Sequence, residues 1–500
     1  MNSSLARKTA WSAVASASSL LGRLTVQIMI ARMLGAEGVG RIAYIVWLIE
    51  ISNLLTCFGL PSALTRYLAE LHGQQKSADA AIFAQWVFLR YLALSLVGSA
   101  VVALMFFHSS QYAGAESVLP VLIVLFLAYG LQAINQADLA GRQRFDLLAR
   151  INLISSFTLV IGVAVGAYGF GVTGAVYGYV IGAVVPALYS FTILKGFSFR
   201  QKVSPDLRIR VWKFTFNTWL AMLVSAFVWS RMDIFFLERY WNAREVAMFT
   251  VGLTFATMVQ QAATLLSGSF MAHFSHLLGT GKHELVQRQY ESATRLMAFV
   301  VIPMAFGGAA IMPVLLPLLF GAEFAPAIPN AMVLTATSAL AFSTVGSSLV
   351  YAKERSGFIA LGGFAGAILS VMAGFLIVSS FGAWGAVWSK LFVQSSMIAL
   401  GTWFIVTQLH FSYPLGSLAR TLLAGVLCSV SAWIIIHCVP CPVVAICIAV
   451  PLGAVIYVFS VKFLGVLRTA EVCHLKRVIA HLPVGLHKFF SVSLDAMVRA

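Results

Sequence analysis

Charged residues are scarce in this chain of 500 residues, and acidic residues are the scarcest of them. Asp, Glu, Lys and Arg together make up 10% of the sequence, and 17 acidic residues face 33 basic ones. Soluble domains carry about 25% charged residues. Hydrophobic residues, by contrast, make up 60% of the chain. This composition excludes a soluble domain of useful size and predicts an all-α protein that crosses a membrane many times.

Long apolar runs fill almost the whole chain. A membrane-spanning helix needs about 20 predominantly apolar residues. We identify fourteen such runs, at about 9–31, 42–61, 82–107, 118–137, 147–168, 173–194, 213–237, 247–269, 293–316, 328–351, 357–379, 384–407, 416–437 and 442–464. The first run is not expected to be a cleavable signal, because Arg23 interrupts it and no small-residue cleavage site follows.

Lysine and arginine are missing from five of the alternate connections between these runs. The connections without them are 108–117, 169–172, 317–327, 380–383 and 438–441. By the positive-inside rule these face outward, so both termini are expected in the cytoplasm. The net charge of +16 therefore reflects topology, and we expect no nucleic-acid partner. Arg32, Arg41, Arg239 and Arg244 are exceptions to this rule, because they fall on connections that should face outward. They occupy matching places in the two repeats, which suggests that their positive charge has a function.

The outward connections are also short, none exceeding about a dozen residues. A membrane enzyme such as a polysaccharide polymerase or ligase needs a sizeable extracytoplasmic loop for catalysis. We therefore do not expect an enzyme.

The six cysteines form no recognisable framework. Cys438 and Cys441 form a lone CxxC at a predicted outward turn. A zinc site needs two further ligands, and only His437 lies close in sequence. A local disulfide is a second possibility, but the pattern favours unpaired thiols, and we expect neither metal nor cofactor.

The sequence contains an internal repeat. Residues 22–37 align with 230–245 at an offset of 208, and 170–178 align with 381–389 at an offset of 211. Spans 1–6 and 7–12 are therefore two copies of one unit. Because six is even, both copies enter the membrane in the same direction, as parallel repeats.

The repeat predicts four parts of the chain. They are a six-helix lobe at 1–200, a second six-helix lobe at 201–412, two additional helices at 413–466, and a basic amphipathic cytoplasmic tail at 467–500. Two further amphipathic segments, 65–79 and 271–292, follow the second and eighth spans. Each is expected to lie along the cytoplasmic interface, close to membrane lipids.

Two arginines lie at matching places inside apolar runs. Arg23 and Arg231 each place a guanidinium in hydrocarbon, at a cost of at least about 2.5 kcal/mol unless the side chain faces a polar space. We expect them to face an internal cavity, where arginine suits a phosphate group because of its planar fork of donors. The alternative is a structural ion pair, of Arg23 with Glu50 and of Arg231 with Asp233 or Glu238.

Four other charged residues are candidates for the site. Lys390, in the twelfth span where the first repeat has Tyr179, either lines the cavity or extends to the membrane surface. Arg90 is a weaker substrate-binding candidate, because it lies near the cytoplasmic end of the third span. Glu50 and Asp233 could exchange a coupling proton or sodium ion, although either could instead pair with an arginine.

Three segments resemble those of a known family. Residues 31–40, ARMLGAEGVG, resemble the A-R-x-L-G-x-x-x-x-G signature after the first span of polysaccharide exporters. Residues 58–67, FGLPSALTRY, are similar to the segment after their second span, and 381–386, FGAWGA, to the opening of their twelfth. The family is that of the polysaccharide transporters, including the O-antigen flippases, within the multidrug/oligosaccharidyl-lipid/polysaccharide flippase superfamily.

This resemblance implies a bacterial inner-membrane flippase for an undecaprenyl-diphosphate-linked oligosaccharide. It also implies two six-helix lobes around a central cavity, working by alternating access, with a polysaccharide polymerase and glycosyltransferases as partners in making O-antigen, lipopolysaccharide or exopolysaccharide. Arg23 matches an arginine often found in the first span of such flippases. The turn 240–245 departs from the pattern, because it lacks the glycine of the first repeat.

An ion-coupled drug or metabolite antiporter of the same superfamily is the alternative. Those proteins favour organic cations, so their cavities should be acidic. The mid-span charges here are balanced or basic, which favours the flippase.

Overall fold

The computed structural model describes residues 3–107, 119–193, 203–229, 232–267, 270–279, 283–353 and 355–466. Within these ranges the chain is helical and contains no strand. The helices are α1 (Ser3–Thr56), α2 (Leu60–Gly73), α3 (Ser77–Phe107), α4 (Leu119–Gly141), α5 (Phe145–Leu188), α6 (Ser190–Ile193), α7 (Pro205–Trp229), α8 (Asp233–Tyr240), α9 (Ala243–Ser267), α10 (Phe270–Gly279), α11 (His283–Phe320), η3 (Ala322–Ala327), α12 (Ile328–Thr337), η4 (Ser338–Ser343), α13 (Thr344–Ala352), α14 (Ser356–Ala373), η5 (Gly374–Val378), α15 (Ser379–Thr407), α16 (Leu415–Cys438) and α17 (Pro442–Leu464).

The helix α1 is a hairpin that reverses at Gly35. This residue has φ 66° and ψ −170°, a conformation that side chains with a Cβ rarely adopt. Arg23 and Glu50 would lie about 40 Å apart on one straight helix. Their charged groups are instead 3.6 Å apart. Gly35 therefore divides α1 into two antiparallel arms, which correspond to the first two predicted spans.

The same reversal occurs at the aligned glycines Gly171 and Gly382, with φ values of 61° and 57°. In α5, Gly166 packs against Gly174, and Gly162 against Gly178, so the two arms are centred on residue 170. In the second repeat the rings of Phe358 and Phe404 stack with centroids 3.7 Å apart, a pair centred on residue 381. The two hairpins thus follow the offset of 211 that the sequence predicts.

Ten helical segments within the described residues are long and apolar enough to cross a membrane. Three of them, Ala15–Thr56, Phe145–Ile193 and Gly357–Thr407, contain the glycine reversals and so cross twice. Helix α7, with charged residues in its first turns, is not among these ten segments. The prediction of an all-α protein that crosses a membrane many times is confirmed.

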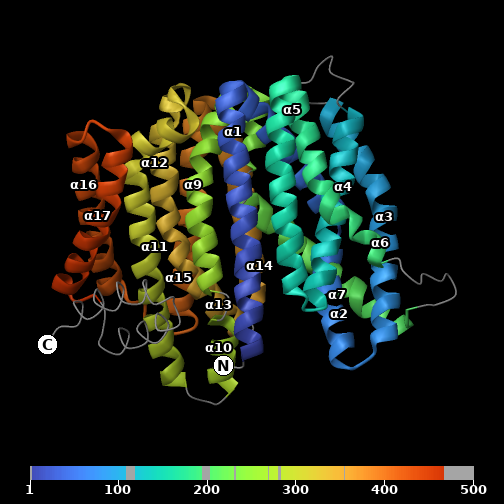
Figure 1. Cartoon of the computed structure of the whole chain (residues 1–500). Helices are drawn as coiled ribbons and strands as arrows, with labels where there is room; N and C mark the ends of the chain where they lie inside the picture. The colour runs from blue at the N-terminus through green and yellow to red at the C-terminus, as the bar shows by residue number, and fades with distance from the viewer. Residues whose placement is uncertain are drawn as a thin grey trace. The chain divides into compact units, whose positions relative to one another are not determined.

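The chain forms two compact units. Unit 1 comprises Met1–Ala247 with Val371–Ala383, and unit 2 comprises Met248–Ser370 with Trp384–Ala500. In unit 1, α1 runs beside α5 (Figure 1), where a Cβ on Gly22 would lie 2.8 Å from the Cβ of Ser156. In unit 2, α16 and α17 lie side by side next to α11 (Figure 1), and Gly425 faces Ile302.

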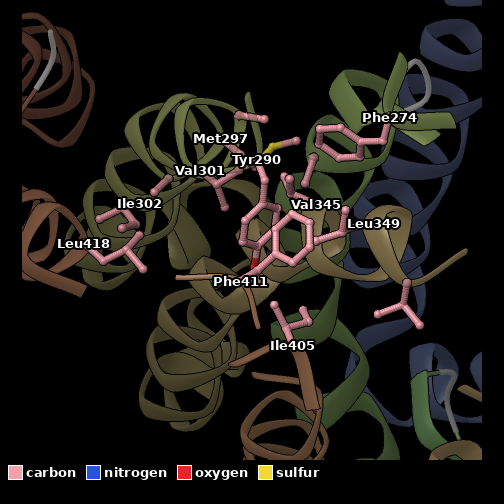
Figure 2. Packing of buried hydrophobic residues seen from close by; sticks show 14 of the residues in the cluster. Phe274, Tyr290, Met297, Val301, Ile302, Val345, Leu349, Ile405, Phe411 and Leu418 are labelled. Carbon is pink, nitrogen blue, oxygen red and sulfur yellow. The ribbon is translucent and has the colours of Figure 1, made fainter. Parts of the chain in front are cut away.

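The core of unit 2 gathers aromatic rings from α10, α11 and the segment before α16. Figure 2 shows Tyr290 beside Phe411, with Phe274 of α10 nearby. The ring centroids of Tyr290 and Phe411 are 6.1 Å apart and nearly perpendicular. Gln287 holds the same segment, since its amide accepts from Ser412 N at 3.0 Å and donates to Ser412 O at 3.1 Å. This side of α10 is therefore packed into protein.

The two predicted interfacial segments differ from the observed helices at their ends. In place of 65–79, helix α2 covers Leu60–Gly73, because Pro61 in its first turn starts the helix and α3 already begins at Ser77. In place of 271–292, α10 ends at Gly279 and α11 has begun by His283. The tail at 467–500 lies outside the described residues.

Candidate functional site

Arg23 and Glu50 face each other across the α1 hairpin. The Arg23 Nη1 and Glu50 Oε1 atoms are 3.6 Å apart, and the side chains are 67% and 39% exposed. A direct charge-assisted hydrogen bond has a length of about 2.7–2.9 Å. The pair is thus loose, and most of the Arg23 side chain remains accessible. The ion pair of Arg23 with Glu50, which the sequence left open as the alternative to a substrate role, is present.

Two phenols complete the surroundings of Arg23. Tyr129 of α4 and Tyr179 of α5, both half-buried, interact electrostatically with the guanidinium. The cluster of Arg23, Glu50, Tyr129 and Tyr179 therefore draws on both arms of α1, on α4 and on the second arm of α5. We call it the unit 1 polar cluster. It combines a cation, an acid and two hydroxyl groups, which suits an anion carrying hydroxylated groups.

The sequence pattern alone gives little indication that these two tyrosines belong to the site. Tyr129 looks like an ordinary aromatic residue in an apolar run. Tyr179 did carry a signal, because it aligns with Lys390 at the offset of 211.

Arg231 lies outside the described residues. Its suggested partners, Asp233 and Glu238, lie on α8 and are 6% and 3% exposed. Both take part in polar or electrostatic interactions. Two buried acids on so short a helix keep this segment a candidate for ion coupling.

Lys390 belongs to unit 2 and Arg90 to unit 1, and each has surroundings of its own. Lys390 of α15 is 5% exposed and takes part in a polar interaction, so its ammonium group does not extend to the membrane surface. On the same helix, Ser389 Oγ and Gln394 Nε2 are buried, and no partner is recorded for them in the described chain. Arg90 is exposed on α3, and its guanidinium lies 5.6 Å from the ring centre of Trp86, one helical turn away.

A further buried acid lies at the end of α4. Asp138 is fully buried, and its Oδ2 accepts from Arg142 Nε at 2.8 Å and from the Tyr189 hydroxyl at 3.4 Å. Burial lowers the pKa of Arg142, but the hydrogen bond and charge of Asp138 outweigh it and hold that pKa above its ordinary value. This arrangement fastens the end of α4 to α5 and supports a structural role for Asp138.

The turns after the first arm of α1 and after α8 touch each other within unit 1. A Cβ on Gly40 would lie 1.7 Å from the backbone oxygen of Ala243. Beside this contact, Ala383 N donates to Glu245 Oε2 at 2.7 Å, and Trp241 Nε1 donates to Val378 O at 2.9 Å. The turn that lacks the glycine of the first repeat is therefore held by side chains.

Within the described ranges, no group of three or more His, Cys, Asp or Glu side chains is placed to hold a metal ion. Cys438 and Cys441 are exposed and unpaired at the turn between α16 and α17.

Solved structures share this fold. The lipid II flippase MurJ in an inward closed conformation matches with a TM-score of 0.73 at 14% identity, covering 90% of this chain and 98% of that one. An inward-facing multidrug resistance MATE transporter of the MOP superfamily matches with a TM-score of 0.58 at 15% identity, covering 78% and 94%. A MOP superfamily transporter from Pyrococcus furiosus Vc1, described by a reverse polarity of its binding pocket, gives 0.57 at 15% identity, covering 81% and 95%.

A search of curated proteins gave no match. The family model for polysaccharide biosynthesis proteins matches residues 29–329, which is more than half of the sequence. The chain, a multi-pass helical membrane protein, therefore belongs to the polysaccharide biosynthesis protein family.

Proposed function

We propose that this protein is a flippase, which carries an undecaprenyl-diphosphate-linked oligosaccharide across the bacterial inner membrane by alternating access. No bond is made or broken in this task. A diphosphate and polar sugars must pass the hydrocarbon while the polyprenyl tail stays in lipid. The diphosphate loses the most hydration, so the protein has to supply cationic donors in its place.

The observation that carries this proposal is the loose, accessible pairing of Arg23 with Glu50. Ion pairs between groups this exposed contribute about 0–1 kcal/mol to stability. The pair is therefore a weak structural element. A phosphate oxygen can replace the Glu50 carboxylate at small cost and take a bidentate hydrogen bond from the guanidinium.

The surroundings of Arg23 fit the rest of such a passenger. Tyr129 and Tyr179 offer hydroxyl groups and ring faces, both of which suit sugars. In the empty site, the charge of Glu50 balances that of Arg23. When the passenger displaces the Glu50 carboxylate from Arg23, Glu50 could take up a proton or a sodium ion. Arg231 and Asp233 would play the corresponding parts in the second repeat, and Lys390 and Arg90 remain further candidates to contact the substrate.

The proposed setting follows from the proposed passenger. A lipid-linked sugar unit is made by glycosyltransferases on the cytoplasmic side and consumed by a polymerase outside. We therefore place the protein in the inner membrane with both termini in the cytoplasm, in the synthesis of a surface polysaccharide such as O-antigen or exopolysaccharide.

The alternative is an ion-coupled drug or metabolite antiporter, favoured by the shared fold with the multidrug resistance transporter. The charge of the site separates the two. An antiporter for organic cations needs an excess of acid, whereas Arg23 balances Glu50 in the unit 1 polar cluster. The description of the Pyrococcus protein also ties pocket polarity to function within the superfamily.

Genetic complementation tests the proposal. A deletion strain should lose its surface polysaccharide, regain it with the wild-type gene, and fail to regain it with Arg23→Gln at equal expression. Arg150→Gln is a matched control, because Arg150 is an exposed arginine on α5. Normal polysaccharide with Arg23→Gln, or drug sensitivity without polysaccharide loss in the deletion strain, would overturn it.

A further inference from the structure

Four arginines depart from the charge pattern of the other connections. Arg32, Arg41, Arg239 and Arg244 lie on the turns that the topology places outward, whereas the five outward connections named above contain no Lys or Arg. Positive charge on outward segments opposes the preferred orientation of a membrane protein. The positive charge on these two turns therefore needs a functional explanation.

The two turns meet through their backbones. The Cβ that a side chain would add at Gly40 lies 1.7 Å from Ala243 O and 2.9 Å from Ala243 Cα. Only glycine allows this approach. Arg41 and Arg244 directly follow the two touching residues, so the contact brings the backbones of two arginines, one from each repeat, close together within unit 1. Arg239, in the last turn of α8, adds a third.

The two turns carry more arginines than acids. Segments 32–41 and 239–245 hold four arginines but only two glutamates. Glu37 pairs with Arg41 on its own helix. Glu245 directs its Oε2 to the backbone of Ala383. The adjacent acid, Glu238, is 3% exposed.

Arg239 and Arg244 are thus left to bind something else. Both are exposed, and within the described chain neither has an acidic partner. Several guanidinium forks match the oxygens of a diphosphate better than they match a single carboxylate.

We propose that Arg41, Arg239 and Arg244 form an outer anion site, which receives the diphosphate of the lipid-linked passenger when it reaches the outer leaflet. This inference rests on the proposed function and on the predicted topology. The outer anion site would lower the cost of leaving the Arg23 region, because the diphosphate passes between two cationic groups. It would also bias release toward the outer face.

Arginine footprinting on the full-length protein in phosphatidylcholine nanodiscs tests this site. An arginine-selective dicarbonyl reagent is applied with and without farnesyl diphosphate, and modification of each arginine is measured by mass spectrometry. At about ten times Kd, occupancy predicts about tenfold protection of Arg239 and Arg244. Arg150 should show no protection, and inorganic diphosphate at the same concentration should protect less, because it lacks a lipid anchor.

Variants separate this inference from the proposed function. Arg23→Gln should leave the protection of Arg239 and Arg244 in place, and Arg239→Gln/Arg244→Gln should leave the protection of Arg23 in place. Protection of Arg23 alone in the wild type overturns the outer anion site and leaves the proposed function standing. Protection of neither region overturns both.

A further experiment tests whether the bound anion is the lipid-linked diphosphate or an ordinary anionic lipid. If nanodiscs containing phosphatidylglycerol protect Arg239 and Arg244 fully, and farnesyl diphosphate adds nothing, the surface binds ordinary anionic lipid and the inference is wrong.

Discussion

The Glu245 carboxylate accepts a hydrogen bond from the backbone N–H of Ala383 at 2.7 Å. This bond ties the start of α9 to the reversal at Gly382. The aligned residues of the first repeat, Glu37 and Val172, do not share it, since Glu37 pairs with Arg41 instead. The two repeats thus have matching hairpins, but different side-chain interactions stabilise their turns.

Removing the hydrogen bond between Ala383 N and the Glu245 carboxylate should destabilise the protein. Glu245→Ala leaves a backbone N–H without its acceptor, at an expected cost of about 1–3 kcal/mol. Glu37→Ala breaks an exposed pair within one helix, which is worth about 0.3–0.5 kcal/mol. Thermal unfolding of the purified protein should show a clearly lower Tm for Glu245→Ala than for Glu37→Ala. Equal Tm values would contradict the asymmetry.

The contact at Gly40 should tolerate no side chain. Gly40→Ala places a methyl group 1.7 Å from Ala243 O, so the turns must separate. We expect a loss of about 1–3 kcal/mol or more. Gly401→Ala is the matched control, because a Cβ there meets nothing within 4 Å. Folded yield by size-exclusion chromatography and Tm should fall for the first variant only. A Gly40→Ala protein as stable as the control would rule out this close packing.

The Arg23 and Glu50 pair should matter for transport far more than for stability. A double-mutant cycle of Arg23→Gln and Glu50→Gln should give a coupling energy below about 1 kcal/mol, as for other exposed pairs. Complementation should nevertheless be lost with Arg23→Gln. A coupling of several kcal/mol, with transport lost in proportion to folded protein, would assign the pair to structure instead.

Cysteine accessibility should report the topology. Cys438 and Cys441 are exposed at the turn between α16 and α17, whereas Cys57 and Cys428 are buried at 7% and 6% exposure. In intact spheroplasts, a membrane-impermeant maleimide should label Cys438 or Cys441 in single-cysteine variants. Cys57 and Cys428 should stay unlabelled until the protein is denatured.

Labelling of Cys438 and Cys441 only from inverted vesicles would reverse the predicted orientation. It would place Arg239 and Arg244 in the cytoplasm and remove the basis of the outer anion site.

Parts of the site could be foreseen only in outline. The pairing of Arg23 with Glu50 was one of two open alternatives, because the sequence shows both charges but not the angle at which two helix arms face each other. The burial of Lys390 was equally open, since a lysine near a helix end reaches the surface or the interior depending on its neighbours. The tyrosines near Arg23 went unnoticed, because phenols in apolar runs usually belong to packing.

The fold class and the repeat can be predicted from the sequence alone. Hydrocarbon permits only long apolar helices with few charges, and that constraint is local enough to read along the chain. Tertiary structure decided which distant groups meet. Arg23 reaches Glu50 because Gly35 reverses α1, and Gly40 reaches Ala243 because two turns pack backbone to backbone. Such contacts depend on backbone reversals and helix packing across hundreds of residues, which no local pattern encodes.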